Sequence, residues 1–324
     1  MRFFDGLEGV PAGFGPSAVT IGKFDGLHLG HQSVLRQLRE LADERGLTAT
    51  VVTFDRNPLQ LLAPDKCPDA LVSNAQKREL LEAAGVDATL MLHFDRELAD
   101  ESPEHFIENV LVGALHAQVV LCGADFRFGA RGAGDVELLR RSGVEHGFDV
   151  VILSDVEVGG ADGPRRASAT WVRELMAAGR VREAARLLGR LPSIRSTVVH
   201  GEQRGRELGY PTANLDPAIE GLLPLDGVYA TWAVVDGVTY GSATSIGNNP
   251  TFEGVPQHQV ETHLFDQKLD LYDKPIELQF VDYVRPMNKF ESVEALVARL
   301  HEDDLLVREI LAGETAGQAA GETR

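Results

Sequence analysis

Short apolar runs alternate with amphipathic stretches through the first half of the chain. The runs are four to seven residues long and cover residues 18–21, 48–54, 89–94, 118–122 and 149–155. Continuous apolar runs of this length are typical of strands that are buried on both faces of a sheet. Because strands that alternate with helices pair in parallel, the pattern predicts an α/β fold with a doubly wound parallel sheet. The ligand site of such a sheet lies beyond the carboxyl ends of its strands.

The stretches between these runs carry apolar residues at helical spacing. They cover residues 29–45, 73–85, 102–115 and 135–145. Ser73 and Gln76 have the spacing of a capping box, and Gly85 suits a helix C-cap. The Ser102-Pro103 pair likewise indicates the start of a helix.

Past residue 190 the pattern changes to runs with strand character. These runs cover residues 196–200, 227–247, 259–265 and 276–284, and one clear helix follows over 292–311. Asp236-Gly237 lies between two Val-rich arms and is a hairpin signal. The second half is therefore expected to form a small antiparallel β-barrel or sandwich with a C-terminal helix.

The change of pattern gives the domain boundaries. We expect one domain over residues 1–187 and a second over residues 188–312. Residues 313–324 are rich in Gly, Ala, Glu and Thr and have no apolar period, so this tail is expected to be disordered.

Composition and charge exclude several classes of protein. The chain has 324 residues and a formal net charge of −18, which argues against a broad electrostatic grip on nucleic acid or on an anionic membrane. Two cysteines, Cys67 and Cys122, are too few for a disulfide framework or a Cys-based zinc site. No stretch resembles a signal peptide or a membrane span, so we expect the protein to work in the cytoplasm.

The segment GKFDGLHLGH, residues 22–31, lies at a strand-to-helix junction. Backbone N–H groups and the helix dipole favour an anion at such a junction. His28 and His31, with Gly30 between them, can point together at one phosphate and donate hydrogen bonds to it. A bare HxxH is more often a pair of solvated or capping histidines, but the flanking glycines favour the phosphate site. Zinc is a weaker alternative, because no third ligand is evident.

Two further segments of the first half belong with this junction. GADFRFGARGAG, residues 123–134, follows another strand of the same sheet and therefore reaches the same edge, although its aromatic residues suit loop packing equally well. Ser168 and Thr170 stand just before a helix that carries Arg173. Such hydroxyls are usually caps, but with an Arg one turn further they also suit phosphates.

The second half has a constellation of its own in residues 198–215. Glycines let a backbone approach phosphates closely, and the oxygens of Thr212 and Asn214 suit Mg²⁺. Glu261 lies on the opposite face of its strand from the Val and Leu row. A lone Glu on a strand usually faces solvent, but beside these residues it suits a general base that takes a proton from a hydroxyl attacking ATP.

Taken together, the first-half motifs resemble the nucleotidyltransferase module of the bifunctional bacterial FAD synthetase family (riboflavin kinase/FMN adenylyltransferase). The resemblance implies a nucleotidyltransferase-like sheet, in which His28 and His31 are catalytic. It assigns nucleotide and phosphate binding to Gly22, Phe24, Asp25, Gly30, Ser168, Thr170 and Arg173, and flavin binding to Asp125, Phe126 and Phe128. One departure is Ala169, which stands where the family usually has a second Ser.

The second half is similar to the riboflavin kinase module of the same family. The resemblance implies that Thr212 and Asn214 bind Mg²⁺ with the nucleotide and that Glu261 is the base. It assigns the kinase nucleotide to Gly201, Gly205, Arg206 and Gly209, and a flavin contact to Arg285. Gln267 and Asp273 depart from the family pattern, where Phe and Gly are expected.

The resemblance covers about residues 15–311 and implies a two-step enzyme. The C-terminal module would phosphorylate riboflavin with ATP to FMN, and the N-terminal module would join FMN to a second ATP to give FAD and pyrophosphate. The expected ligands are therefore riboflavin, FMN, FAD, ATP and Mg²⁺, with no nucleic acid and no membrane. The sequence leaves open whether the chain forms a homo-oligomer.

Two alternatives remain at this stage. In one, a single activity is retained and the other domain is a flavin-binding regulatory module; the loss of Thr212, Asn214 or Glu261 would have favoured it. In the other, the chain binds nucleic acid through an HxxH turn, but the acidic balance and the absence of a basic stripe speak against this.

Overall fold

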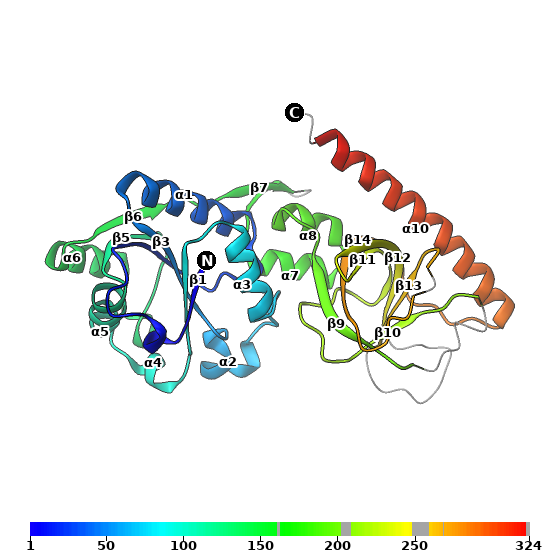
Figure 1. Cartoon of the computed structure of the whole chain (residues 1–324), viewed down its shortest axis with the longest axis horizontal. Helices are drawn as coiled ribbons and strands as arrows, with labels where there is room; N and C mark the ends of the chain where they lie inside the picture. Colours follow the sequence, from blue (N-terminus) through cyan, green and yellow to red (C-terminus); the bar gives the residue numbers. More distant parts are fainter. Residues whose placement is uncertain (161–162, 202–208, 248–258, 268, 322–324) are drawn as a thin grey trace. The chain divides into compact units, whose positions relative to one another are not determined.

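The computed structural model describes residues 1–160, 163–201, 209–247, 259–267 and 269–321. The chain divides into two compact units, Met1–Ser168 and Ala169–Arg324 (Figure 1). The domain boundary expected after residue 187 stays a prediction. Helices α7 (Ala169–Ala177) and α8 (Val181–Leu188) belong to the second unit because they pack on each other and α8 packs on strand β14 (Pro275–Arg285).

The first unit is built on a six-stranded parallel sheet with the order β1-β4-β3-β2-β5-β6. Its strands are β1 (Arg2–Asp5), β2 (Ser17–Ile21), β3 (Thr48–Phe54), β4 (Ala88–Leu92), β5 (Ala117–Gly123) and β6 (Asp149–Leu153). The doubly wound sheet is thereby confirmed. The edge strand β1 was not predicted, because its four residues are only partly buried and show no apolar run.

Both faces of this sheet are buried, as continuous apolar strands require. Side chains of consecutive residues point to opposite faces. Val19 therefore packs with Phe106 and Leu111 in one apolar cluster. Its neighbour Ala18 packs with Leu35 of α1 in the other.

Helices and short turns connect the strands. They are η1 (Leu7–Gly9), η2 (Asp25–Leu27), α1 (Leu29–Arg45), α2 (Pro58–Leu62), η3 (Pro64–Lys66), α3 (Asn74–Ala83), α4 (Arg96–Asp100), α5 (Pro103–Phe106), η4 (Ile107–Ala114), η5 (Ala130–Gly132) and α6 (Val136–His146). The capping box is confirmed, since the Ser73 hydroxyl accepts from the Gln76 N–H at 3.1 Å. The predicted helix over 102–115 is instead divided into α5 and a π-helical segment, η4.

The order of the strands fixes where a ligand can bind. The sheet winds one way from β2 to β3 and β4 and the other way from β2 to β5 and β6. A crevice opens where the winding reverses, beyond the carboxyl ends of β2 and β5. A two-stranded ribbon of β7 (Glu157–Gly160) and β8 (Gly163–Arg166) follows β6 and ends the first unit.

The second unit is a closed antiparallel barrel with the order β10-β13-β12-β11-β14-β9. Its other strands are β9 (Ser193–Val199), β10 (Ala213–Leu215), β11 (Gly227–Val235), β12 (Val238–Gly247) and β13 (Gln259–Leu264). The barrel closes because β9 pairs with both β10 and β14, which decides between barrel and sandwich. Asp236 and Gly237 form the predicted hairpin turn, with φ values of 50° and 78°.

Helix α10 (Val293–Gly321) covers the barrel through Val307 and Leu311. It extends past residue 311, so residues 313–321, which were expected to be disordered, are helical in the structure. Ala, Gln and Glu are good helix formers, and adding residues to an existing helix is much easier than nucleating one.

Candidate functional site

The loop after β2 brings the two histidines together. Phe24 and Leu27 have φ values of 46° and 40°, and this tight turn places His28 as the N-cap of α1. His31 lies one turn into the helix. The two imidazole rings stack with centroids 3.8 Å apart and an interplanar angle of 25°, and the ring of Phe24 lies 5.0 Å from that of His31.

Burial keeps both imidazoles uncharged. His28 is 6% exposed, and burial, with a smaller effect of Arg166, lowers its pKa to about 4. Burial also lowers the pKa of His31 well below its ordinary value. The Nδ1 atoms of both rings are buried and have no hydrogen-bond partner among the described residues. Two buried polar atoms left unsatisfied in this way indicate a site for a ligand.

Two glycines make room for these rings. A Cβ atom on Gly30 would lie 3.1 Å from the Cε1 and Nδ1 atoms of His28 and 3.3 Å from the carbonyl oxygen of Ala167. A Cβ on Gly22 would lie 3.1 Å from the ring of Phe24. Asp25 holds the loop, because its carboxylate accepts the backbone N–H of Leu71 at 2.9 Å.

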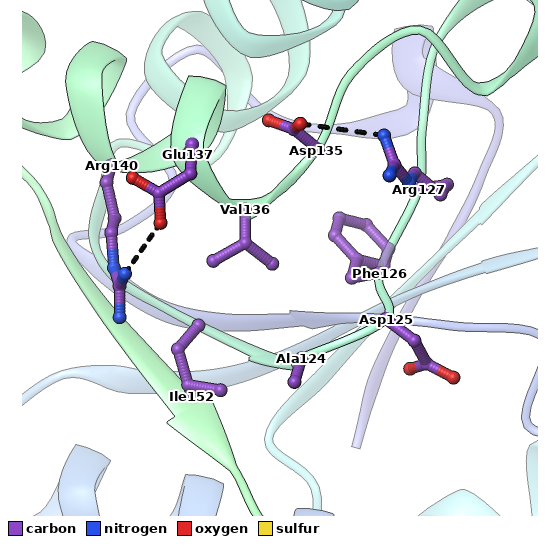
Figure 2. Close-up of a pocket in the computed structure, with 9 residues that line it drawn as sticks. All are labelled: Ala124, Asp125, Phe126, Arg127, Asp135, Val136, Glu137, Arg140 and Ile152. Carbon is purple, nitrogen blue, oxygen red and sulfur yellow. Dashed lines mark hydrogen bonds and ion pairs between the residues drawn. The ribbon is translucent and has the colours of Figure 1, made fainter.

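The loop after β5 forms the wall of a pocket of about 430 Å³. Figure 2 shows this pocket between the ends of β5 and β6 and the first turn of α6. Phe126 lines it, and its ring stacks on that of Phe128 at 5.4 Å. Phe128 itself is buried against Phe106, so it supports the loop from the core. Of the two, the structure therefore places Phe126 alone in the pocket lining.

Asp125 is engaged by an arginine that the sequence analysis did not single out. Arg166 on β8 forms an ion pair with Asp125 at 2.9 Å and another with Asp155 at 3.0 Å. The first of these lowers the pKa of Asp125. The ribbon end that leads to Ser168 is thereby fixed to the β5 loop.

The three residues assigned to phosphates at the domain junction lie around the start of α7. Ser168 is the last residue of the first unit, and Ala169 is the first residue of α7. Thr170 is exposed and Arg173 is half-buried, one turn into the helix. The assignment of these residues to phosphate stays a prediction.

In the second unit, the residues assigned to the metal and the base lie together. Asn214 on β10 is directly opposite Glu261 on β13, and the Thr212 hydroxyl donates to the Glu261 carboxylate at 3.3 Å. The backbone at Gly201 lies so close to the Asn214 amide that a Cβ there would overlap it. Gly209 takes a left-handed φ of 83°, which favours glycine. Gly205 and Arg206 lie outside the described residues.

The oxygen atoms of this cluster fit Mg²⁺. A hydroxyl, a side-chain amide and a carboxylate are hard ligands that leave room for water and nucleotide oxygens. Among the described residues, no group of three or more His, Cys, Asp or Glu side chains could hold a metal ion. A magnesium site here would be completed by water and by oxygens of the nucleotide.

Arg285 is held by the C-terminal helix. It is 8% exposed, and Asp303 of α10 accepts from its Nε and Nη2 atoms at 2.6–3.0 Å. The structure thus gives this predicted flavin contact a buried partner at the end of β14.

The departure at Asp273 has a structural explanation, because its φ of 60° is left-handed, and Asp tolerates this conformation better than most residues other than Gly and Asn.

Comparison with known proteins finds two domains in this chain. The FAD synthetase family matches residues 12–165, and the riboflavin kinase family matches residues 188–311. A bifunctional riboflavin kinase/FMN adenylyltransferase from Escherichia coli strain K12 is 38% identical over 292 residues, which cover 90% of this chain and 91% of that protein. The chain belongs to the bifunctional riboflavin kinase/FMN adenylyltransferase family.

Other members of the family agree over similar lengths. The bifunctional riboflavin kinase/FMN adenylyltransferase of Pseudomonas fluorescens is 36% identical over 96% of this chain and 98% of its own. A crystal structure from Streptococcus pneumoniae, described as a macrolide-efflux protein, has a TM-score of 0.83 and 30% identity over 95% of this chain and 99% of that one. In the described part of this chain, no helix has both the length and the apolar character needed to cross a membrane.

Two charged residues of this family member lie near the histidines and were not singled out from its sequence. Arg166 stands two residues before Ser168 in the sequence, and that proximity was the available signal. Lys77 lies on α3 and is 7% exposed. It stands four residues before the buried Leu81, so a polar residue on the apolar face of a helix was the signal.

Proposed function

We propose that the chain makes FAD in two steps at two separate sites, one in each unit. In the second unit, riboflavin and ATP give FMN and ADP. In the first unit, FMN and a second ATP give FAD and pyrophosphate. The observation that carries this proposal is that each unit holds its own cluster of candidate residues, the stacked histidines in one and the Thr212–Glu261 contact in the other.

The histidine pair suits adenylyl transfer. An oxygen of the FMN phosphate attacks the α-phosphorus of ATP, and the bond from that phosphorus to the pyrophosphate oxygen breaks. No proton transfer is needed, so catalysis consists of positioning and of stabilising charge on the phosphoryl oxygens. A neutral imidazole has one N–H to donate, and the unpartnered Nδ1 atoms of His28 and His31 supply that capacity. We assign nucleotide contacts in this unit to Gly22, Phe24 and Gly30.

The Glu261 cluster suits phosphorylation of an alcohol. The carboxylate takes the proton from the terminal hydroxyl of riboflavin as that oxygen attacks the γ-phosphorus of ATP. Thr212 positions Glu261 through their 3.3 Å hydrogen bond. Mg²⁺ bound by Thr212 and Asn214 would neutralise charge on the ATP phosphates. We assign flavin contacts to Arg285 in this unit and to Asp125 and Phe126 in the first unit. We also propose that the protein is located in the cytoplasm.

Two variants test the assignment of the sites. Each is incubated with ATP and Mg²⁺ and either riboflavin or FMN, and the flavins are then separated chromatographically. His28→Ala should convert riboflavin to FMN but make no FAD, because it lacks only the second reaction. Glu261→Gln should leave riboflavin unchanged yet convert supplied FMN to FAD. If a folded variant of either kind loses both reactions, the two-site assignment is wrong; if His28→Ala still makes FAD, the role of the histidines is wrong.

A further inference from the structure

Lys77 is a buried lysine next to the histidine loop. It lies on α3, which packs against the η2 turn that precedes His28. In the part of the chain that the structure describes, its ammonium donates one hydrogen bond, of 3.0 Å, to the carbonyl oxygen of Phe54 at the end of β3. An ammonium has three N–H donors. Burying it with one acceptor is therefore unfavourable unless nearby groups stabilise its charge.

The hydrogen bonds around Lys77 join α3 to the carboxyl ends of two strands. The Thr53 hydroxyl donates to the carbonyl oxygen of Lys23 at 3.2 Å, which links the end of β3 to the loop after β2. The backbone N–H of Leu71, just before α3, donates to Asp25 in the same loop at 2.9 Å. With the Lys77 bond, these contacts hold α3 and the histidine loop in one arrangement.

The positive groups around His31 come from several elements. Lys77 on α3, Lys23 after β2 and Arg166 on β8 all lower the pKa of His31, as does the neighbouring His28, while burial lowers it most. A protonated pair of imidazoles 3.8 Å apart would repel each other and separate. The stacked arrangement therefore disfavours a charge on both rings at once.

Two carboxylates favour the charge on Lys77. Burial lowers the pKa of Lys77, and Asp25 and Asp55 act in the opposite direction. Asp55 is itself held in place, because its carboxylate accepts the backbone N–H of Phe94 at 2.9 Å. The ammonium is therefore held by its hydrogen bond to Phe54 and favoured by the charges of two carboxylates.

We propose that Lys77 is a positioning residue for adenylyl transfer, whose buried ammonium fixes α3 to the end of β3 and keeps the stacked histidines in place for the anionic substrates. This inference rests on the proposed function of the first unit. Lys77 acts through His31 and the loop, and it need not touch the substrate.

Three variants separate the charge of Lys77 from its hydrogen bond. Lys77→Gln keeps an N–H donor for the Phe54 carbonyl and removes the charge, whereas Lys77→Met removes both. Arg78→Met is the matched control, because Arg78 is the next residue on α3, is exposed, and lies over the ring of Phe3 at 4.5 Å. The assay measures kcat and KM for FMN conversion over a range of pH, and FMN formation from riboflavin serves as an internal control.

Both Lys77 variants should lose about tenfold or more in kcat for FAD formation, with the KM for FMN little changed. The acidic limb of the pH profile should move to higher pH, because removing a positive charge makes His31 easier to protonate. The NMR titration of the His31 ring should move in the same direction. FMN formation, and both reactions of Arg78→Met, should stay at the wild-type level.

If Lys77 acted only through its hydrogen bond, Lys77→Gln would keep the wild-type kcat and pH profile. This variant therefore distinguishes the two roles even if Lys77→Met fails to fold. If Lys77→Gln keeps the wild-type kcat and pH profile while His28→Ala stops at FMN, the inference about Lys77 is overturned and the proposed function stands. If His28→Ala also makes FAD normally, the proposed function fails first.

Discussion

Gly30 determines how closely the backbone approaches the histidine pair. Gly30→Ala adds a Cβ 3.1 Å from the His28 ring, which is tighter than an ordinary contact, so the ring must shift. Overpacking of this kind costs roughly 1–3 kcal/mol, and we expect FAD formation from FMN to fall about tenfold or more. Gly13→Ala is the control, since nothing lies within 4 Å of its Cβ position. Unchanged FAD formation in Gly30→Ala would mean that the position of the His28 ring does not matter.

The depressed pKa of His28 makes the first unit sensitive to acid. The unfolded chain binds a proton near pH 6.5, whereas folded His28 does so near pH 4. Between these values the unfolded state holds more protons, so the free energy of unfolding should fall as pH falls, by roughly 3 kcal/mol in all. His28→Gln should weaken this dependence. Urea denaturation followed by circular dichroism at pH 7 and pH 5 checks it, and an equal loss in both proteins contradicts it.

Single residues were predicted best where the signal was local. The histidine pair and the Thr212–Asn214 segment are contiguous in the sequence, and the structure brings each set together. Lys77 and Arg166 were missed because their importance comes from groups distant in the sequence. Burial and charge at a residue depend on the packed fold, which a local pattern does not contain.

At the scale of elements, α10 is fastened to the barrel by the ion pair of Arg285 and Asp303. Asp303→Asn leaves a guanidinium buried without its carboxylate, which should destabilise the second unit by about 3–5 kcal/mol. Glu302→Gln is the matched control, because Glu302 is 64% exposed and its ion pair with Arg299 should contribute less than about 1 kcal/mol. Calorimetry should show the second unit unfolding at a lower temperature in Asp303→Asn alone. An equal effect of the two variants would contradict the buried role of this pair.

Elements with strong local signals were predicted well, and those without were not. The capping box depends on Ser73 and Gln76, and the hairpin turn depends on Asp236 and Gly237. Strand β10 has only three residues and exists because β9 and β13 flank it. The π-helical turn at Ile107–Ala114 keeps a helical apolar pattern, so periodicity did not distinguish it from an α-helix.

For the whole molecule, the sequence predicted two domains of different class, and the structure has both. The packing of α7 and α8 could not be predicted from pattern alone, because both have ordinary helical periodicity. Their place in the second unit follows from the packing of α8 on β14, which is a contact between segments about 90 residues apart.

The acidic net charge describes the molecule as a whole, whereas the histidine loop is surrounded by Lys23, Lys77 and Arg166.

The most direct test of two separate sites mixes two variants that each lack one half-reaction. His28→Ala and Glu261→Gln proteins are incubated together with riboflavin, ATP and Mg²⁺, and FMN and FAD are separated by chromatography. Neither variant alone should make FAD from riboflavin, but the mixture should, because FMN released by the first is a substrate for the second. A mixture of folded variants that makes no FAD, although each keeps its own half-reaction, would show that the two steps must occur on one chain. Loss of both half-reactions in either variant would contradict two independent sites.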